Sequence, residues 1–250
     1  MVQRDEGLLP RLRTLRAAHP FWGYRRVGAH LRCVEQLPAN RTRGWRLMRG
    51  HGPLVPPNGK LKATRTPLGR NPGPAKPNAW WGIDLTKVLV QGVGWVSSVV
   101  VLDWYSKAVV GDEAGLRWTT RQWLQALDRA VNRHFPHGAR EQGLPLMREN
   151  GCQPTARAFM EACSPLGIHP ACTGATNPKG HADPERLMRT LKGACLWLRD
   201  WTCPLQLMNT LAHWITYDNA HYLHSALGYV PPRPFERDHH HRHGSPFVAA

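Results

Sequence analysis

Three carboxylates that lie far apart in the sequence could together hold metal ions. Asp84 follows an apolar Trp-Trp-Gly-Ile run, Glu149 precedes an Asn-Gly pair, and Glu185 follows an Asp-Pro pair, with 35 residues between Glu149 and Glu185. Hard divalent cations such as Mg²⁺ take oxygen ligands, and two of them about 3.5 to 4 Å apart can stabilise both the attacking and the leaving oxygen of a phosphoryl displacement. The three carboxylates therefore indicate metal-dependent chemistry on nucleic acid.

Two predicted strands should support the first two carboxylates. Apolar and β-branched residues predict strands over 81–90 and 144–148. Asp84 then lies inside the first strand, and Glu149 lies at the C-terminal end of the second. A strand is a stiff support, so both carboxylates should be held in fixed positions.

A predicted helix should support the third carboxylate. Asp183 is expected to be the N-cap and Pro184 the first helical residue, which places Glu185 at the positive end of the helix dipole. Arg189 and Lys192 follow Glu185 at i+4 and i+7, on the same helix face. One face therefore offers a metal ligand beside two phosphate contacts.

Each carboxylate also has an ordinary structural interpretation. Glu185 alone is a common type of acidic residue at a helix N-terminus. Asp84 alone could be a charge at a strand edge or a turn partner, and Glu149 before Asn-Gly could be a turn residue. Only the three together, with their spacing and flanking residues, favour a metal site.

The body of the chain is predicted to be a mixed α/β layer. Residues 95–102 carry no charge and predict a central strand covered on both faces. With the strand at 81–90 and a third beginning at 108–111, they form an antiparallel meander. Further elements are expected as helices from Thr119 or Thr120 to about 135 and over 155–166, as a strand over 168–172, and as a loop over 173–180.

Three short helices are predicted before this body, over 8–18, 24–33 and 41–49. Asn40 is a suitable N-cap for the third helix. In that helix Arg43, Arg46 and Arg49 recur at i, i+3 and i+6, with Trp45 and Met48 expected on a different face. Three short helices with one basic ridge suit a helix-turn-helix that binds DNA, although an ordinary solvated helix face has the same pattern.

Positive charge is concentrated at the N-terminal end. The chain of 250 residues has 33 Lys and Arg against 17 acidic residues, a formal charge of +16. Residues 1–79 hold 16 of these basic residues and three acidic ones, a net +13, which leaves +3 for the rest. Residues 51–79, with seven prolines, four glycines and no acid, are predicted to be a basic linker. Such asymmetry favours a polyanionic partner, and a solvated, disordered basic arm is the alternative.

Cysteine, histidine and apolar residues give three further expectations. The six cysteines form no C-x-x-C pair and follow no apolar signal, so we expect reduced thiols, an intracellular protein and no zinc or disulfide framework. His239, His240, His241 and His243 lie in a polar segment that is expected to be a disordered tail. The longest apolar run is too short to span a membrane. Core positions are expected for Trp197, Trp201 and Trp214.

Several motifs in order resemble the OrfB-type transposases of bacterial insertion sequences, which are related to retroviral integrases. The motifs are the helix-turn-helix segment 21–26, Trp80 to Thr86, Asp103 to Gly111, Asn150 to Gln153, Asn177 to Gly180, Glu185 with Arg189 to Lys192, and the C-terminal 222–229 with Pro231-Pro232. The resemblance covers nearly the whole chain. Each motif alone is weak, but their order is specific.

The resemblance implies a ribonuclease H-like fold and a DDE-type enzyme, a polynucleotidyl transferase and endonuclease. Asp84, Glu149 and Glu185 would be catalytic and would hold two Mg²⁺ or Mn²⁺ ions. Water would first expose a DNA 3′-OH, which would then attack another phosphodiester without a covalent protein intermediate. The chain would divide into a helix-turn-helix-like module at 1–50, a linker at 51–79, an integrase core at 80–230 and a polar tail at 231–250.

The same resemblance implies partners and a location. Double-stranded DNA, as terminal inverted repeats and target, would be bound by Arg43, Arg46, Arg49, Lys179, Arg189 and Lys192. The protein would act as a homo-oligomer on DNA, either alone or with an upstream-frame product fused to it. It would work in the bacterial cytoplasm at the nucleoid, without a membrane partner.

Glu149 departs from the family pattern, which has aspartate in an Asp-Asn-Gly motif at this position. The change keeps the charge but adds one methylene, and catalytic groups must be held to within about 0.5 Å of productive geometry. Two alternatives to an active transposase therefore stay open: a DNA-binding derivative with an impaired active site, and a ribonuclease H-like nuclease without transposition. The basic N-terminal segment argues against the nuclease.

Overall fold

The structure is a computed structural model that describes residues 7–20, 22–37, 39–51, 73–117, 119–148, 157–172 and 182–244. The chain divides into two compact units. The smaller unit contains residues 1–70 together with 223–229, and the larger contains 71–222 together with 230–250. The boundary at residue 70 falls inside the predicted linker, most of which lies outside the described residues.

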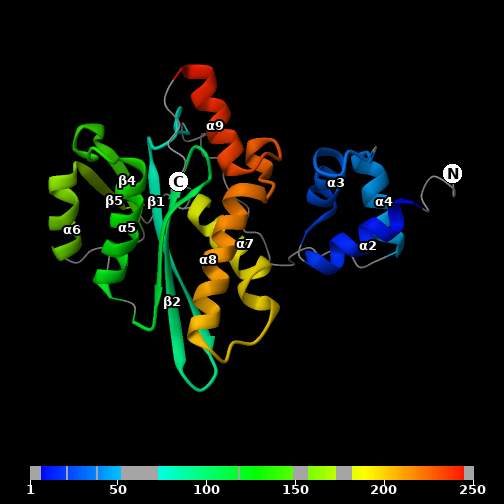
Figure 1. The fold of residues 1–250 in the computed structure, drawn as a ribbon, viewed down its shortest axis with the longest axis horizontal. Helices are drawn as coiled ribbons and strands as arrows, with labels where there is room; N and C mark the ends of the chain where they lie inside the picture. Colours follow the sequence, from blue (N-terminus) through cyan, green and yellow to red (C-terminus); the bar gives the residue numbers. More distant parts are fainter. Residues whose placement is uncertain are drawn as a thin grey trace, which may run out of the picture. The chain divides into compact units, whose positions relative to one another are not determined.

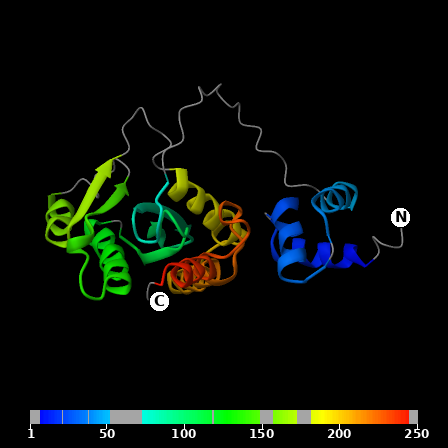
Figure 2. The ribbon, with the colours of Figure 1, turned by 90° about the horizontal axis from the view of Figure 1, so that it is seen from above.

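In the described part of the smaller unit lie three α-helices, which begin where the sequence predicts them: α2 (Leu8–Ala18), α3 (Tyr24–Cys33) and α4 (Arg41–His51) (Figures 1 and 2). Asn40 caps α4, because its Oδ1 accepts the backbone N–H of Arg43 at 2.7 Å. Apolar side chains of all three helices are buried, among them Leu12, Val27, Leu31 and Leu47. Burying these side chains is what allows helices of 10 or 11 residues to persist.

The larger unit is built on one mixed sheet of five strands. They are β1 (Trp81–Val90), β2 (Gly94–Asp103), β3 (Val109–Gly115), β4 (Leu144–Arg148) and β5 (Ile168–Cys172), in the order β3-β2-β1-β4-β5. The first three form the predicted antiparallel meander, with Trp81 opposite Asp103 and Val90 opposite Gly94. β4 pairs in parallel with β1, and β5 in parallel with β4. This is the sheet of a ribonuclease H-like fold, as predicted.

Helices cover both faces of this sheet (Figure 1). α5 (Thr120–His134) and α6 (Arg157–Cys163) pack on one face, where the core contains Trp81, Ile83, Val99, Val101, Trp123 and Phe159. α7 (Ala182–Ala194) and α8 (Pro204–His221) pack on the other, where it contains Val100, Leu102, Leu187, Leu191, Leu211 and Ile215. Since alternate residues of a strand point to opposite faces, β1 and β2 contribute to both cores.

Two tryptophans are not where the sequence predicts them. Trp95 should lie in a strand covered on both faces, but it is 50% exposed, whereas β2 is buried from Val96 onwards. Trp197 was expected in the core and is 67% exposed, while Trp201 and Trp214 are buried as predicted. The reason is position: Trp95 lies next to the β1–β2 turn, and Trp197 lies in the segment after α7, beyond the layers that cover the sheet.

The predicted disordered tail is wrong for residues 232–243, which form helix α9 (Pro232–His243). The helix packs on the turn that follows β2: Tyr105 Oη lies 2.9 Å from His239 Nδ1, and the Tyr105 ring contacts Phe235. Glu236 of α9 is buried there. Proline at the first position of the helix and these contacts explain why a polar sequence is ordered. No helix in the described ranges is both long and apolar enough to cross a membrane.

Candidate active site

Asp84 is a buried carboxylate in the middle of the sheet. It lies in β1, 8% exposed, and its Oδ1 accepts the backbone N–H of Leu85 at 2.8 Å. The pKa of Asp84 is raised to about 6, chiefly by burial and in part by the nearby negative charge of Glu185, against the lowering effects of the Leu85 hydrogen bond and of Lys192. The electrostatic interactions place Glu185 and Lys192 of α7 close to this carboxylate. Two carboxylates close together, one of them buried, repel each other when both are charged, and a bound cation would stabilise their charged forms.

Helix α7 begins two residues earlier than predicted, at Ala182 instead of Pro184, so Asp183 is not its N-cap. The Asp183 carboxylate instead binds Lys107, with Nζ to Oδ2 at 2.8 Å. Lys107 Nζ also donates to the Trp104 carbonyl. Asp183 thus ties the first turn of α7, which includes Glu185, to the turn after β2.

Gly82 allows α7 to approach the sheet closely. A Cβ atom at Gly82 would lie 2.7 Å from Pro184 Cγ and 2.5 Å from Trp104 Nε1, both shorter than any normal contact. Gly82 lies two residues before Asp84, on the same face of β1, and Pro184 directly precedes Glu185. The absence of a side chain at Gly82 therefore brings the two carboxylate-bearing elements together.

The turn between β2 and β3 is held by Asp103. This buried carboxylate accepts bonds from the Ser106 backbone N–H at 2.8 Å, the Ser106 hydroxyl at 2.6 Å and the Asn78 backbone N–H at 3.1 Å. Burial raises the pKa of Asp103, and these hydrogen bonds oppose the rise. Because its oxygens are used within the turn, Asp103 is a structural carboxylate that presents Lys107 to Asp183.

Among the other predicted site residues of the larger unit, two lie on α7 and two lie outside the described residues. Arg189 is exposed and Lys192 is partly buried on α7, the helix of Glu185. Glu149 and Lys179 lie outside the described residues, so their predicted roles stay predictions. Within the described ranges no three His, Cys, Asp or Glu side chains group as a metal site. Asp84 and Glu185 interact electrostatically, and the role of the three carboxylates as metal ligands stays a prediction.

The predicted arginine ridge lies on α4 of the smaller unit. Arg46 and Arg49 are exposed and Arg43 is partly buried. Met48 is buried, which agrees with its expected place on a different face from the arginines, but Trp45 is exposed and the Arg49 guanidinium lies 5.1 Å from its ring centroid. The expectation that Trp45 faces away from the arginines is wrong here, because residues at i and i+4 share a helix face.

Sequence reasoning missed the residues that position the site. Lys107 and Gly82 both lie in motifs that carry the family resemblance, but neither was expected to contact helix α7. The available signal was weak: a glycine inside a strand often marks a close backbone approach. No local pattern relates Lys107 to Asp183, which are 76 residues apart.

The sequence of this chain is similar to those of known transposases. Transposase InsD for insertion element IS2A/D/F/H/I/K of Escherichia coli is 25% identical, over 93% of this chain and 79% of the transposase. Transposase InsD for insertion element IS2-9 of Escherichia coli strain K12 is also 25% identical, over 93% of this chain and 78% of its own length. No protein-family model matches the chain.

Among solved structures, a chain of the simian T-cell lymphotropic virus intasome superposes with a TM-score of 0.56. The match covers 95% of this chain and 76% of the intasome chain, at 17% sequence identity. Identity at this level supports the fold alone. The fold of the larger unit is therefore the one that the sequence predicts.

Proposed function

The chain is a relative of insertion-sequence transposases with an integrase-like core, and on this basis we propose that it cleaves DNA at the ends of a mobile element and transfers the strands to a target. The observation that carries the proposal is the buried Asp84 within electrostatic reach of Glu185, on a strand and a helix that are held together at Gly82 and by the ion pair of Lys107. A strand interior and the first turn of a helix are rigid supports, and such a reaction needs its two carboxylates to be held in fixed positions.

Asp84, Glu149 and Glu185 would hold two Mg²⁺ or Mn²⁺ ions. When bound, the two ions would stabilise the attacking and the leaving oxygen of an in-line phosphoryl displacement. The residues fit such ions, because burial disfavours the charged form of Asp84 and a nearby cation would stabilise it. Below about pH 6 the proton on Asp84 would compete with the cation for its oxygens.

The reaction proposed for this site has two steps. In the first, water attacks a phosphodiester at the element end, a P–O bond forms, and the DNA 3′ oxygen leaves as a hydroxyl. In the second, that hydroxyl attacks a target phosphodiester, which again exchanges one P–O bond for another. Arg189 and Lys192, on the helix of Glu185, would contact phosphates and orient the strand.

The basic helix α4 would place the protein on its DNA. Arg46 and Arg49 are exposed on this helix. In a helix-turn-helix of three short helices, one helix can enter the major groove of DNA. We propose that the bound sequences are terminal inverted repeats, that copies of the chain assemble on two ends, and that an upstream-frame product fuses to it or assists it. Its place of action would be the bacterial cytoplasm, at the nucleoid where this DNA lies.

A strand-transfer assay with linear terminal-repeat DNA and Mg²⁺ or Mn²⁺ tests the proposal. Wild-type protein should cut and join DNA, whereas Asp84→Asn and Glu185→Gln should each lose at least a hundredfold in rate while binding the same DNA in a gel-shift assay. Equal activity of either variant would overturn the assignment of the site.

A second candidate function is a DNA-binding derivative with an impaired active site, and Glu149 is the residue that favours it. Such a protein would bind terminal repeats and compete for them without cutting. Wild-type protein that binds the repeats but stays inactive with both ions would favour this function over transposition.

A further inference from the structure

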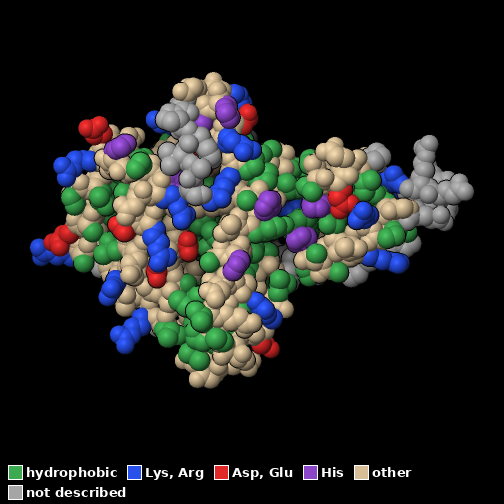
Figure 3. All heavy atoms as spheres, in the orientation of Figure 1, with side chains coloured by type: hydrophobic (Ala, Val, Ile, Leu, Met, Phe, Trp, Pro, Cys, Tyr) green, Lys and Arg blue, Asp and Glu red, His purple; other side chains and the backbone are tan. Residues whose placement is uncertain are grey.

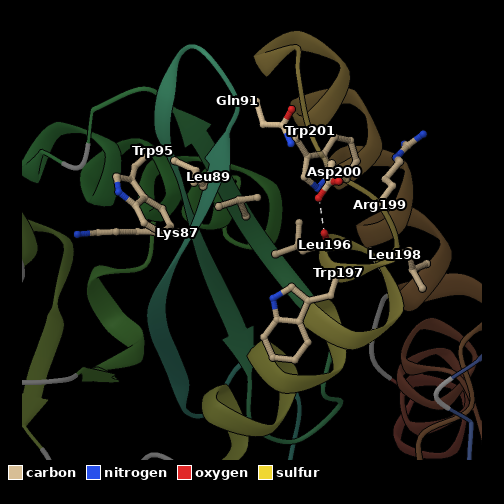
Figure 4. Close-up of a pocket in the computed structure, with 11 residues that line it drawn as sticks. Lys87, Leu89, Gln91, Trp95, Leu196, Trp197, Leu198, Arg199, Asp200 and Trp201 are labelled. Atoms are coloured by element: carbon tan, nitrogen blue, oxygen red, sulfur yellow. Dashed lines mark hydrogen bonds between the residues drawn. The ribbon is translucent and has the colours of Figure 1, made fainter.

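Two surface features of the larger unit are not used by the proposed function. One is a cavity of about 500 Å³ at the β1–β2 turn. Its walls do not form one binding face, because Lys87 and Trp95 project from the side of the hairpin that faces away from Trp197 (Figure 4). The other feature is a group of histidines on helix α9, which lie close enough for two of their rings to stack.

Helix α9 gathers histidines in its last two turns, at positions 239, 240, 241 and 243. Figure 3 shows histidine side chains at the surface where Figure 1 places this helix. Residues at i and i+4 share one face of a helix, so His239 and His243 are neighbours. Their ring centroids are 4.2 Å apart, with an angle of 25° between the ring planes. The helix therefore holds two imidazoles side by side.

Hydrogen bonds at the Nδ1 atoms leave Nε2 of both rings for a ligand. His243 Nδ1 lies 2.8 Å from the His239 carbonyl oxygen, which can only accept a hydrogen bond. The proton of the neutral His243 ring is therefore on Nδ1, and its lone pair is on Nε2. His239 Nδ1 lies 2.9 Å from Tyr105 Oη, which can accept the same kind of bond. Each ring thus has the second hydrogen bond that usually orients a metal-binding imidazole.

The surroundings of the two rings suit a cation. His243 is the last residue of α9, and the C-terminal end of a helix carries partial negative charge. Arg242, which precedes it, forms an ion pair with Asp238, and this offsets the positive charge of the guanidinium. His243 is exposed and His239 is partly buried, so an ion from solvent can reach both rings.

We propose that His239 and His243 bind a divalent transition-metal ion such as Zn²⁺ through their Nε2 atoms. Imidazole nitrogen suits Zn²⁺, whereas Mg²⁺ takes oxygen ligands, so this ion differs from those proposed for the carboxylates. The nearly parallel rings must tilt toward each other before both nitrogens reach one ion at about 2.0 to 2.1 Å, and the exposed His243 ring can do so. Because no group of three His, Cys, Asp or Glu side chains is found among the described residues, water would fill the other positions on the ion.

The bound ion would also strengthen the attachment of α9 to the sheet. It would bridge two turns of the helix and fix the His239 ring, whose Nδ1 contacts Tyr105. Tyr105 belongs to the turn after β2, which also presents Lys107 to Asp183. Metal binding on α9 should therefore stabilise the turn to which the first turn of α7 is tied.

Titration of the full chain with Zn²⁺ in excess Mg²⁺ tests this proposal. Isothermal titration calorimetry counts the Zn²⁺ ions per chain, and the melting temperature reports the stability. His239→Ala and His243→Ala should each bind one Zn²⁺ fewer than wild type, and should lose the rise in melting temperature that this ion gives. Tyr105→Phe removes the hydroxyl that orients His239 and should weaken binding at this site by roughly 10- to 100-fold.

Two histidines outside the pair serve as matched controls. His213 on α8 is exposed and its Nδ1 lies 2.7 Å from the Asn209 carbonyl oxygen, but no histidine lies four residues before or after it. His241 is exposed on α9 and likewise has no histidine at i−4 or i+4. His213→Ala and His241→Ala should keep the wild-type number of Zn²⁺ ions and the wild-type Kd. In nitrogen-15 NMR of the wild-type protein, Zn²⁺ should shift the Nε2 resonances of His239 and His243.

Either of two results would overturn the proposal. One is a His243→Ala variant that binds Zn²⁺ with the wild-type stoichiometry and Kd. The other is an equal loss of Zn²⁺ in His213→Ala, which would show ordinary binding to isolated surface histidines. The proposal does not depend on the proposed function, since a chain that fails to cut DNA would give the same titration.

Discussion

Lys107 and Asp183 join the turn after β2 to the first turn of α7 through an ion pair of 2.8 Å. Their side chains are 18% and 27% exposed, so solvent screens the pair only in part. Asp183 lies two residues before Glu185, and the pair therefore restricts the position of the proposed metal ligand. Together with the glycine at position 82, it sets how the helix approaches Asp84.

The first prediction removes this ion pair. Lys107→Gln should leave the Asp183 carboxylate without its cation, lower the stability by about 1 to 3 kcal/mol and raise the Mg²⁺ concentration needed for half-maximal strand transfer. Chemical denaturation gives the stability, and a metal titration of the activity separates positioning from folding. The second readout moves only if Glu185 loses its position.

A matched control is the exposed pair of Arg157 and Glu161 on α6. Arg157→Gln should change the stability by less than about 0.5 kcal/mol and leave the metal titration unaltered, because exposed i,i+4 pairs contribute little. Identical effects of the two variants would show that the Lys107 pair does not position the helix.

The second prediction concerns the close approach at Gly82. Gly82→Ala would place a Cβ 2.5 Å from Trp104 Nε1 and 2.7 Å from Pro184 Cγ, so the helix or the strand must shift. We expect a loss of about 1 to 3 kcal/mol in stability and a large loss of activity. As a control, Gly50→Ala in helix α4 meets no atom within 4 Å and should not destabilise the protein. Wild-type activity of Gly82→Ala would contradict the role given to this contact.

The strands and helices were largely predictable because their patterns are local. Apolar runs located β1 and β4 with their observed bounds, and Asn40 correctly predicted the start of α4. The failures involve contacts between distant segments. The sequence around Asp183 predicts an N-cap because nothing near it indicates Lys107, and the polar sequence of α9 does not show that Glu236 is buried against the turn after β2. Asp84 and Glu185 are indicated as metal ligands by their flanking residues and spacing, and the family resemblance supports the same assignment.

The third prediction uses the pH dependence of Glu236. The pKa of this carboxyl is raised from an ordinary value of 4.5 to about 7, chiefly by burial and in part by the charge of Asp103, while Arg233 opposes the rise. The folded protein therefore keeps a proton that the unfolded chain releases between about pH 4.5 and 7. Stability falls as the pH rises through this window, and above it the buried anion costs about 3 kcal/mol.

Glu236→Gln should remove that cost. We expect the variant to be more stable than wild type at pH 8 and nearly equal at pH 5, measured as the melting temperature across the range. Glu161→Gln, which changes an exposed carboxylate, should show no such crossover. His240 Nε2 lies 4.0 Å from Glu236 Oε1 and burial lowers the pKa of this imidazole, so His240→Gln serves as a second reference. A parallel pH profile for wild type and Glu236→Gln would refute the assignment.

The fourth prediction tests the arginines of α4. Arg46→Gln and Arg49→Gln should each weaken binding to terminal-repeat DNA and reduce the slope of log Kd against log salt by roughly one phosphate contact. Anisotropy at several salt concentrations measures both. Arg157→Gln, which removes an exposed arginine from α6, is the control for net charge. Binding that barely depends on salt would argue against this role.

The last prediction concerns Glu149, where the resembled family has aspartate. If the extra methylene displaces a carboxylate oxygen from the best position for a metal ion, Glu149→Asp should raise the rate of strand transfer, by tenfold for each 1.4 kcal/mol of transition-state stabilisation regained. The assay uses terminal-repeat DNA in Mg²⁺ and in Mn²⁺. The double variant Asp84→Asn with Glu149→Asp should stay inactive, which ties the gain to the same site. Equal strand-transfer rates for wild type and Glu149→Asp in both ions would show that the site accommodates the longer side chain. Glu149 would then support the same activity as aspartate.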